Sequence, residues 1–84
     1  MQTLPYFKTT DINPLQENIM RFIDTWIRTE KTLVPQREII AKMEEEGRKS
    51  FTVANALTGL LRKGYIRRAN TSRKVTLYVQ LRSV

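Results

Sequence analysis

The sequence of 84 residues contains no cysteine and no histidine. Without cysteine, neither a disulfide nor a zinc–thiolate site can stabilise the fold, and the chain fits a reducing, cytoplasmic environment. The commonest general bases and the thiol nucleophiles are missing with these two residue types. There is no glycine-rich phosphate loop, and the acidic residues form no paired constellation. We therefore expect no enzyme activity, no cofactor, no metal site and no small-molecule ligand.

Long apolar runs are also missing. No stretch approaches the roughly 20 apolar residues that a membrane span needs. The polar residues Gln2, Thr3 and Lys8 interrupt the N-terminus, where a signal peptide would be apolar. Apolar residues still make up 40% of the chain, which is enough for a globular core. The composition predicts one small domain that does not enter a membrane.

Acidic residues are absent from the second half of the chain. Residues 1–46 hold all eight acids and six basic residues, whereas residues 47–84 hold nine basic residues and no acid. Repulsion among so many like charges destabilises a compact state unless a polyanion neutralises them. Nucleic acid is such a polyanion, because its neutralised phosphates release condensed counterions. This division of charge favours a nucleic-acid binding face in the second half.

Hydrophobic periodicity divides the chain into an N-terminal arm, residues 1–12, and a domain, residues 13–84. Asn13 and Gln16 fit a capping box, so we expect a first helix that ends near Thr29. Apolar residues recur at helical spacing on one wide face of this helix. They are Leu15, Ile19, Met20, Phe22, Ile23, Trp26 and Ile27. So wide a stripe predicts burial against two neighbours, such as the rest of the domain and either the arm or a second copy.

Two glycines mark the ends of two further helices. Residues 32–34 are a short β-favouring run before a proline, which starts a second helix over residues 36–46. Gly47 ends that helix, because glycine readily adopts the left-handed conformation. Ser50 is the expected N-cap of a third helix, which Gly64 ends.

The third helix, residues 51–63, has two different sides. At 100° per residue, Val53, Leu57, Leu60 and Leu61 cluster on one side, and Asn55, Thr58, Gly59 and Arg62 lie opposite. Phe51 lies near the polar side; contact with a thymine methyl group is one alternative, and packing against the second helix is the one that we expect. The leucine side is predicted to be anchored in the core, which leaves the asparagine side free.

The C-terminal residues predict a β-hairpin. Residues 65–69 form the first expected strand, and residues 70–72 have turn-forming side chains. From Val75 on, apolar and polar residues alternate. The alternation predicts that Val75, Leu77, Val79 and Leu81 face the core.

This order of elements, helix, short strand, helix, helix, strand, strand, is that of winged helix-turn-helix domains. Residues 34–41 resemble the start of that family's second helix, residues 51–60 its recognition helix, and residues 61–68 the exit into its wing. Over residues 14–82 the chain is similar to the DNA-binding domain of LexA-type repressors and to MarR-type regulators. The resemblance implies an α+β, mainly α fold: three helices, a short strand after the first, and a C-terminal hairpin that serves as the wing.

The resemblance also implies binding to double-stranded DNA, with the third helix in the major groove. Asn55, Thr52 and Thr58 are expected to meet base edges, and Arg62 a phosphate. Lys49 and Ser50, at the start of that helix, are expected to bind a phosphate through the helix dipole. Gln36 and Arg37, at the start of the second helix, are expected to hold the DNA backbone strand beside the groove. The basic residues around the wing tip are expected to reach phosphates or a narrow minor groove. The full candidate set is Gln36, Arg37, Lys49, Ser50, Thr52, Asn55, Thr58, Arg62, Arg67, Arg68, Arg73 and Lys74.

Three functions are consistent with these sequence features. The first is a sequence-specific transcriptional regulator associated with the nucleoid, with a homodimer through the arm and first helix as one possible form. The second is an architectural or replication-associated protein that binds DNA without sequence preference. The third is a winged helix that docks on other proteins in a larger assembly; the apolar arm and wide first-helix stripe favour it, and the basic second half disfavours it.

Overall fold

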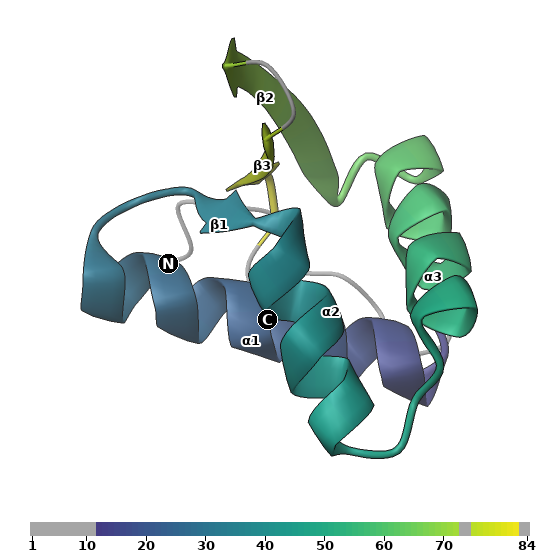
Figure 1. Cartoon of the computed structure of the whole chain (residues 1–84). Coiled ribbons are helices and arrows are strands. Elements are labelled where there is room, and N and C mark those ends of the chain that lie inside the picture. Colours follow the sequence, from purple (N-terminus) through teal and green to yellow (C-terminus); the bar gives the residue numbers. More distant parts are fainter. Residues whose placement is uncertain (1–11, 73–74, 83–84) are drawn as a thin grey trace.

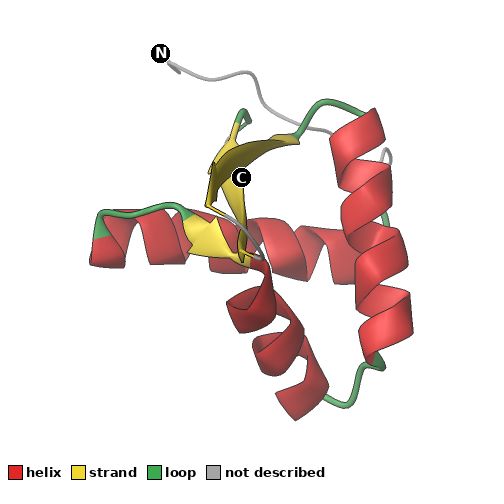
Figure 2. Cartoon of the chain, turned by 45° about the horizontal axis from the view of Figure 1, so that its top comes forward, coloured by secondary structure: helices red, strands yellow, loops and turns green. Residues whose placement is uncertain are grey.

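The element order is the one that the sequence predicts. The computed structural model of the chain describes residues 12–72 and 75–82. Its helices and strands (Figure 1) are α1 (Pro14–Glu30), β1 (Val34–Pro35), α2 (Gln36–Glu45), α3 (Ser50–Arg62), β2 (Ile66–Ser72) and β3 (Val75–Gln80). The three strands form one antiparallel sheet, on one side of the helices (Figure 2). The predicted α+β class, with three helices and a C-terminal pair of strands, is confirmed.

A capping box begins α1, as predicted. The Gln16 backbone N–H donates to Asn13 Oδ1 at 2.8 Å, and the Asn13 backbone N–H donates to Gln16 Oε1 at 3.1 Å. The helix ends one residue later than expected, because Lys31 adopts the left-handed conformation (φ 62°) and its N–H still bonds to the Ile27 carbonyl. Residues 1–11 of the predicted arm lie outside the described residues. Its last residue, Ile12, is buried in the core.

The other two helices begin without a side-chain cap. Ser50, the predicted N-cap of α3, is instead the first helical residue, and Lys49 is the N-cap. The Lys49 backbone is extended, and its carbonyl accepts the first helical hydrogen bond, from the Val53 N–H. Pro35 holds the same position before α2. At the helix ends, Gly47 has a φ of 88° and Gly64 one of 79°, which confirms their predicted roles.

The central strand of the sheet is β3, since the strand order is β1-β3-β2. The turn predicted at residues 70–72 is wrong, because these residues belong to β2. The register pairs Ala69 with Leu77 but Ser72 with Val75, so β2 carries one extra residue, a β-bulge. The strand therefore continues through the predicted turn to Ser72, and residues 73–74 lie outside the described residues.

The predicted buried face of β3 is also wrong. Tyr78 is the buried residue of this strand, with 2% of its surface exposed, whereas its apolar neighbours are only half-buried. Tyr78 pairs with Val34 of β1, which is fully buried. Successive residues of a strand point to opposite faces, so the stripe of Val75, Leu77, Val79 and Leu81 lies on the other face of the sheet. The core therefore contains the large aromatic side chain of Tyr78, and the half-buried aliphatic side chains lie on the opposite face.

The core forms where the helices meet the sheet. Its largest buried side chains come from every element of the fold. They are Ile19, Met20 and Ile23 of α1, Val34 of β1, Ile39 and Met43 of α2, Val53, Leu57 and Leu60 of α3, Ile66 of β2 and Tyr78 of β3. The end of β3 is tied to α1, because Gln80 Nε2 donates to Asp24 Oδ1 at 3.2 Å. This shared core fixes the positions of α3 and of the hairpin relative to α2.

Candidate nucleic-acid interface

The two sides of α3 differ as predicted. Val53, Ala56, Leu57 and Leu60 are buried against the rest of the domain. On the opposite side, four exposed residues follow one another at helical spacing: Phe51, Asn55, Thr58 and Arg62. Ser50 and Thr52, also candidates, are exposed in the first turn. We call the four residues Phe51, Asn55, Thr58 and Arg62 the α3 stripe.

A buried amide anchors α3 against α1. Gln16 is 7% exposed, and its Nε2 donates to the Ala56 carbonyl at 3.2 Å. Gly59 lies beside it: an ideal Cβ at Gly59 would be 2.5 Å from Gln16 Nε2. The prediction that Gly59 belongs to the free, polar side of the helix is therefore wrong. A Cβ there would have to displace the Gln16 amide, so glycine allows α3 to pack closely on α1.

Hydrogen bonding restricts what Thr58 can offer a ligand. Its hydroxyl donates to the Ala54 carbonyl one turn earlier, at 3.1 Å. The hydroxyl proton is then occupied, and the methyl group and an oxygen lone pair remain available. Asn55 is exposed, so its amide is accessible from solvent. Within the α3 stripe, Asn55 is the residue that can both donate and accept a hydrogen bond at once.

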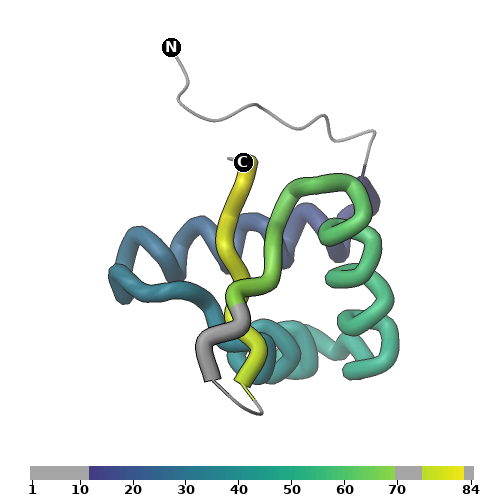
Figure 3. The backbone as a smooth tube through the Cα atoms, turned by 90° about the horizontal axis from the view of Figure 1, so that it is seen from above, coloured from purple at the N-terminus to yellow at the C-terminus, as the bar shows by residue number. Residues whose placement is uncertain are grey.

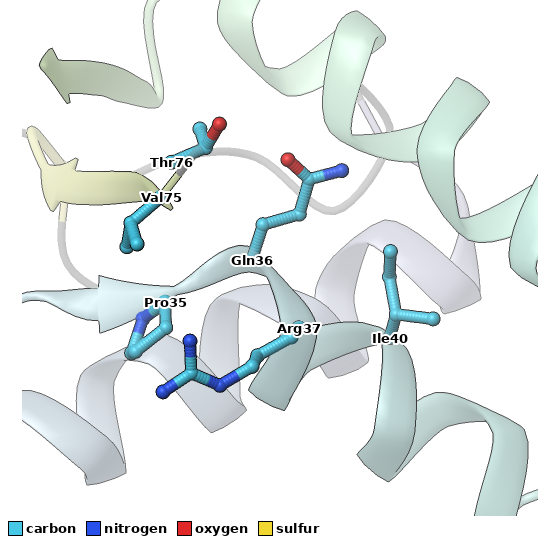
Figure 4. A pocket seen from close by; sticks show the side chains of 6 residues that line it. All are labelled: Pro35, Gln36, Arg37, Ile40, Val75 and Thr76. Atoms are coloured by element: carbon cyan, nitrogen blue, oxygen red, sulfur yellow. The ribbon is translucent and has the colours of Figure 1, made fainter. Parts of the chain in front are cut away.

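A groove lies between the beginning of α2 and the beginning of β3. It has a volume of about 270 Å³ and is lined by Pro35, Gln36, Arg37, Ile40, Val75 and Thr76. Figure 4 shows the Gln36 side chain directed toward Thr76, whereas Arg37 extends back beside Pro35. Gln36 and Arg37 therefore diverge, although both were predicted to hold one DNA strand. The groove places an amide, a hydroxyl and a guanidinium around the uncapped start of α2.

The charge of Arg37 is only weakly compensated. Its Nε lies 3.8 Å from Glu38 Oε2, and 72% of its side chain is exposed. Ion pairs this exposed contribute little stability, so Arg37 stays available to another anion.

The two described arginines of the hairpin, Arg67 and Arg68, lie on different faces of the sheet. Arg67 pairs with Val79 and Arg68 pairs with Tyr78 across the strands, so the two guanidinium groups leave opposite faces of the sheet. Arg68 shares the face of Tyr78, which is turned toward the helices. Arg68 also lines a small pocket with Ala69, Val75 and Thr76, two of which belong to the groove. Arg73 and Lys74, predicted at the wing tip, lie outside the described residues.

The Tyr78 phenol links this arginine to the core. Burial raises the pKa of Tyr78 above its ordinary value of 10.0, and the charge and hydrogen bond of Arg68 reduce that rise without cancelling it. Arg68 donates, and the phenol oxygen accepts. The contact holds the Arg68 guanidinium near the phenol, on the helix-facing side of the hairpin.

Several elements that carry candidate residues lie on one side of the molecule. Seen from above (Figure 3), α2, the first turns of α3 and the beginning of β3 lie along that side, and α1 lies on the other. The salt bridges between described residues all lie within residues 17–45. The later arginines and lysines have no acid near them in sequence, since residues 47–84 contain none.

Sequence reasoning assigned the wrong contact to Phe51 and missed two residues of the groove. Phe51 was expected to pack against the second helix, but it is 74% exposed. The helical wheel held the signal, because Phe51 is four residues before Asn55 and seven before Thr58. Thr76 and Ile40, which line the groove, depend on the strand register and carry no signal of their own.

Comparison of the chain with protein-family models, curated proteins and solved structures gave no match. In residues 12–72 and 75–82, no helix has both the length and the apolar character needed to cross a membrane. The same part of the chain holds no group of three or more acidic side chains that could bind a metal ion.

Proposed function

We propose that this chain is a winged helix domain that binds double-stranded DNA in a sequence-specific manner and regulates transcription. The single observation that carries the proposal is the α3 stripe: a polar, exposed helix face opposite a side anchored by buried apolar residues. An antiparallel sheet with the strand order β1-β3-β2, combined with three helices, is compatible with the winged helix topology. In such domains this helix lies in the major groove.

Base reading is assigned to Asn55. An asparagine amide can bond to both N6 and N7 of adenine, which distinguishes that base in the major groove. Thr52 and the methyl group of Thr58 lie close enough along the helix to meet neighbouring base edges, and Arg62, near the helix end, contacts a phosphate. The base contacts of Asn55, Thr52 and Thr58 give specificity, whereas phosphate contacts such as that of Arg62 set position and orientation.

Phosphate binding is assigned to the uncapped helix starts and their cations. Neither α2 nor α3 has a side chain that caps its first backbone N–H groups. Gln36 and Arg37 lie at the first of these starts, and Lys49 and Ser50 at the second. Free N–H groups and the helix dipole favour an anion at both places.

The test compares Asn55→Ala with Asn18→Ala, which removes an exposed asparagine from α1. The wild type first selects duplexes from a random library, and affinities are then measured for the selected duplex and for random DNA. We expect Asn55→Ala to weaken the selected duplex by about ten- to a hundredfold. Random DNA is expected to change little, and Asn18→Ala is expected to leave both affinities unchanged.

Other results of this experiment would favour one of the alternative functions. Equal loss on both DNAs would remove base reading from Asn55. Selection of no sequence, with salt-dependent binding retained, would make the chain an architectural or replication-associated DNA binder. Absence of binding at low salt would leave protein docking as its role. A palindromic selected sequence would support a homodimer, for which the arm and α1 are the proposed contact.

A further inference from the structure

Phe51 is the large hydrophobic side chain that stays exposed among the described residues, with 74% of its surface accessible. It lies in the first turn of α3, between exposed Ser50 and Thr52. A purely solvated helix start gains nothing from an aromatic ring, because the exposed apolar surface is unfavourable in water. A contact outside the chain would remove that surface from water.

The direction of this side chain indicates what the contact is. Phe51 belongs to the α3 stripe, one helical turn before Asn55, and both are on the side opposite the buried leucines. The early residues of a recognition helix are the ones that reach base edges. Phe51 therefore faces the same ligand surface as Asn55.

Thymine carries an apolar methyl group that the phenyl ring of Phe51 can contact. The floor of the major groove presents hydrogen-bond donors and acceptors, together with the small C5–H of cytosine and the larger C5-methyl group of thymine. A phenyl ring cannot satisfy the polar groups, so adjacent polar base edges would lose their water without a replacement. The methyl group is the partner that gains from such a contact.

We propose that Phe51 determines specificity by packing on the methyl group of a thymine beside the base pair that Asn55 reads. The inference rests on the proposed function, since it requires α3 to lie in the major groove. It adds a thymine to the predicted target sequence, next to the adenine.

Deoxyuridine tests the contact, because it replaces thymine and removes only the methyl group. The duplex selected by the wild type is synthesised with each thymine replaced in turn, and affinities are measured at one salt concentration. At one position the wild type is expected to lose about fourfold in affinity, the value of one buried methyl group. Phe51→Ala is expected to bind the thymine and uracil duplexes equally well.

Phe51→Leu keeps an apolar side chain and is expected to retain part of the methyl preference. Asn55→Ala serves as the matched control, because it should weaken binding and leave the methyl preference intact. Circular dichroism checks that the variants fold. An undiminished methyl preference in Phe51→Ala, or no thymine that shows one, overturns this inference alone.

Failure to select any sequence overturns the proposed function as well. A wild type that is dimeric without DNA, together with a monomeric Phe51→Ala, would assign Phe51 to self-association and also overturn the inference.

Discussion

Gly59 lies where α3 packs on α1, and the Gln16 amide beside it is held at both ends. Its Oε1 accepts from the Asn13 backbone, and its Nε2 donates to the Ala56 carbonyl. The Cβ of Gly59→Ala would therefore displace a side chain that cannot move without losing hydrogen bonds. Alanine gains about 1 kcal/mol in helix propensity, but a broken bond and a buried unpaired amide cost about 2 kcal/mol.

We expect Gly59→Ala to lower the free energy of unfolding by about 1 kcal/mol, measured by urea denaturation. The control is the same substitution in a Gln16→Ala background, where the obstructing amide is absent. There Gly59→Ala should become stabilising, because only the helix propensity remains. Destabilisation of equal size in both backgrounds would contradict this account.

The buried phenol of Tyr78 predicts a loss of stability in alkali. In the unfolded chain the phenol ionises near its ordinary pKa of 10.0, whereas in the folded chain the pKa is raised. Between these two pKa values the unfolded state releases a proton that the folded state retains, so the free energy of unfolding falls as the pH rises.

Tyr78→Phe lacks this proton and loses the Arg68 hydrogen bond, so at neutral pH it should be less stable by about 1 kcal/mol. The difference from the wild type should shrink as the pH rises above 10.0. Urea denaturation at neutral and at alkaline pH measures both values. A difference that stays constant with pH would contradict the predicted ionisation.

Single residues also show where sequence reasoning stops. Asn55 and the leucines of α3 were placed correctly, because helical periodicity determines both sides of a helix. Tyr78 was placed on the wrong face, because alternation indicates that two faces differ but not which one the core accepts. The choice depends on volume and on a partner for the phenol, here Arg68. Gly59 was misplaced because its role depends on Gln16, a residue distant in sequence.

Among the elements, the helix starts differ in how they are stabilised, and this gives a matched pair of substitutions. Asn13 caps α1 through its side chain, whereas Ser50 lies inside α3 and caps nothing. Asn13→Ala should lower the free energy of unfolding by about 1 kcal/mol, because it leaves backbone N–H groups unsatisfied. Ser50→Ala should change it by less than about 0.5 kcal/mol. Thermal and urea denaturation check the pair, and an equal loss would indicate that Ser50 acts as the cap after all.

For the whole molecule, the topology could be read from the sequence, but the relation between hairpin and helices could not. Helix boundaries are marked by Gly47, Gly64 and the Asn13–Gln16 capping box, so the element order follows from local signals. The bulge between Ala69 and Ser72 is set by pairing across the sheet, which local patterns do not encode. Strand alternation alone places Arg67 and Arg68 on opposite faces, but which of them shares the helix-facing side with Tyr78 depends on the register.

That opposition makes a prediction about salt dependence. Arg68 leaves the helix-facing side of the hairpin, near the groove at the start of α2, whereas Arg67 leaves the other face beside Val79. If DNA lies against α3 and the start of α2, Arg68 contacts a phosphate and Arg67 does not. Each phosphate contact contributes about 0.9 to the slope of log affinity against log salt concentration.

Arg68→Ala should therefore reduce that slope by about 0.9, and Arg67→Ala should leave it nearly unchanged, although both remove one charge. Arg68→Lys tests whether charge is the cause, since lysine keeps the charge and should keep the slope. Affinities for random duplex DNA at several salt concentrations give the three slopes, and thermal unfolding checks that loss of the Tyr78 contact leaves the fold intact. Equal slope changes for Arg67→Ala and Arg68→Ala would mean that DNA meets both faces of the hairpin, because only then do both arginines displace counterions.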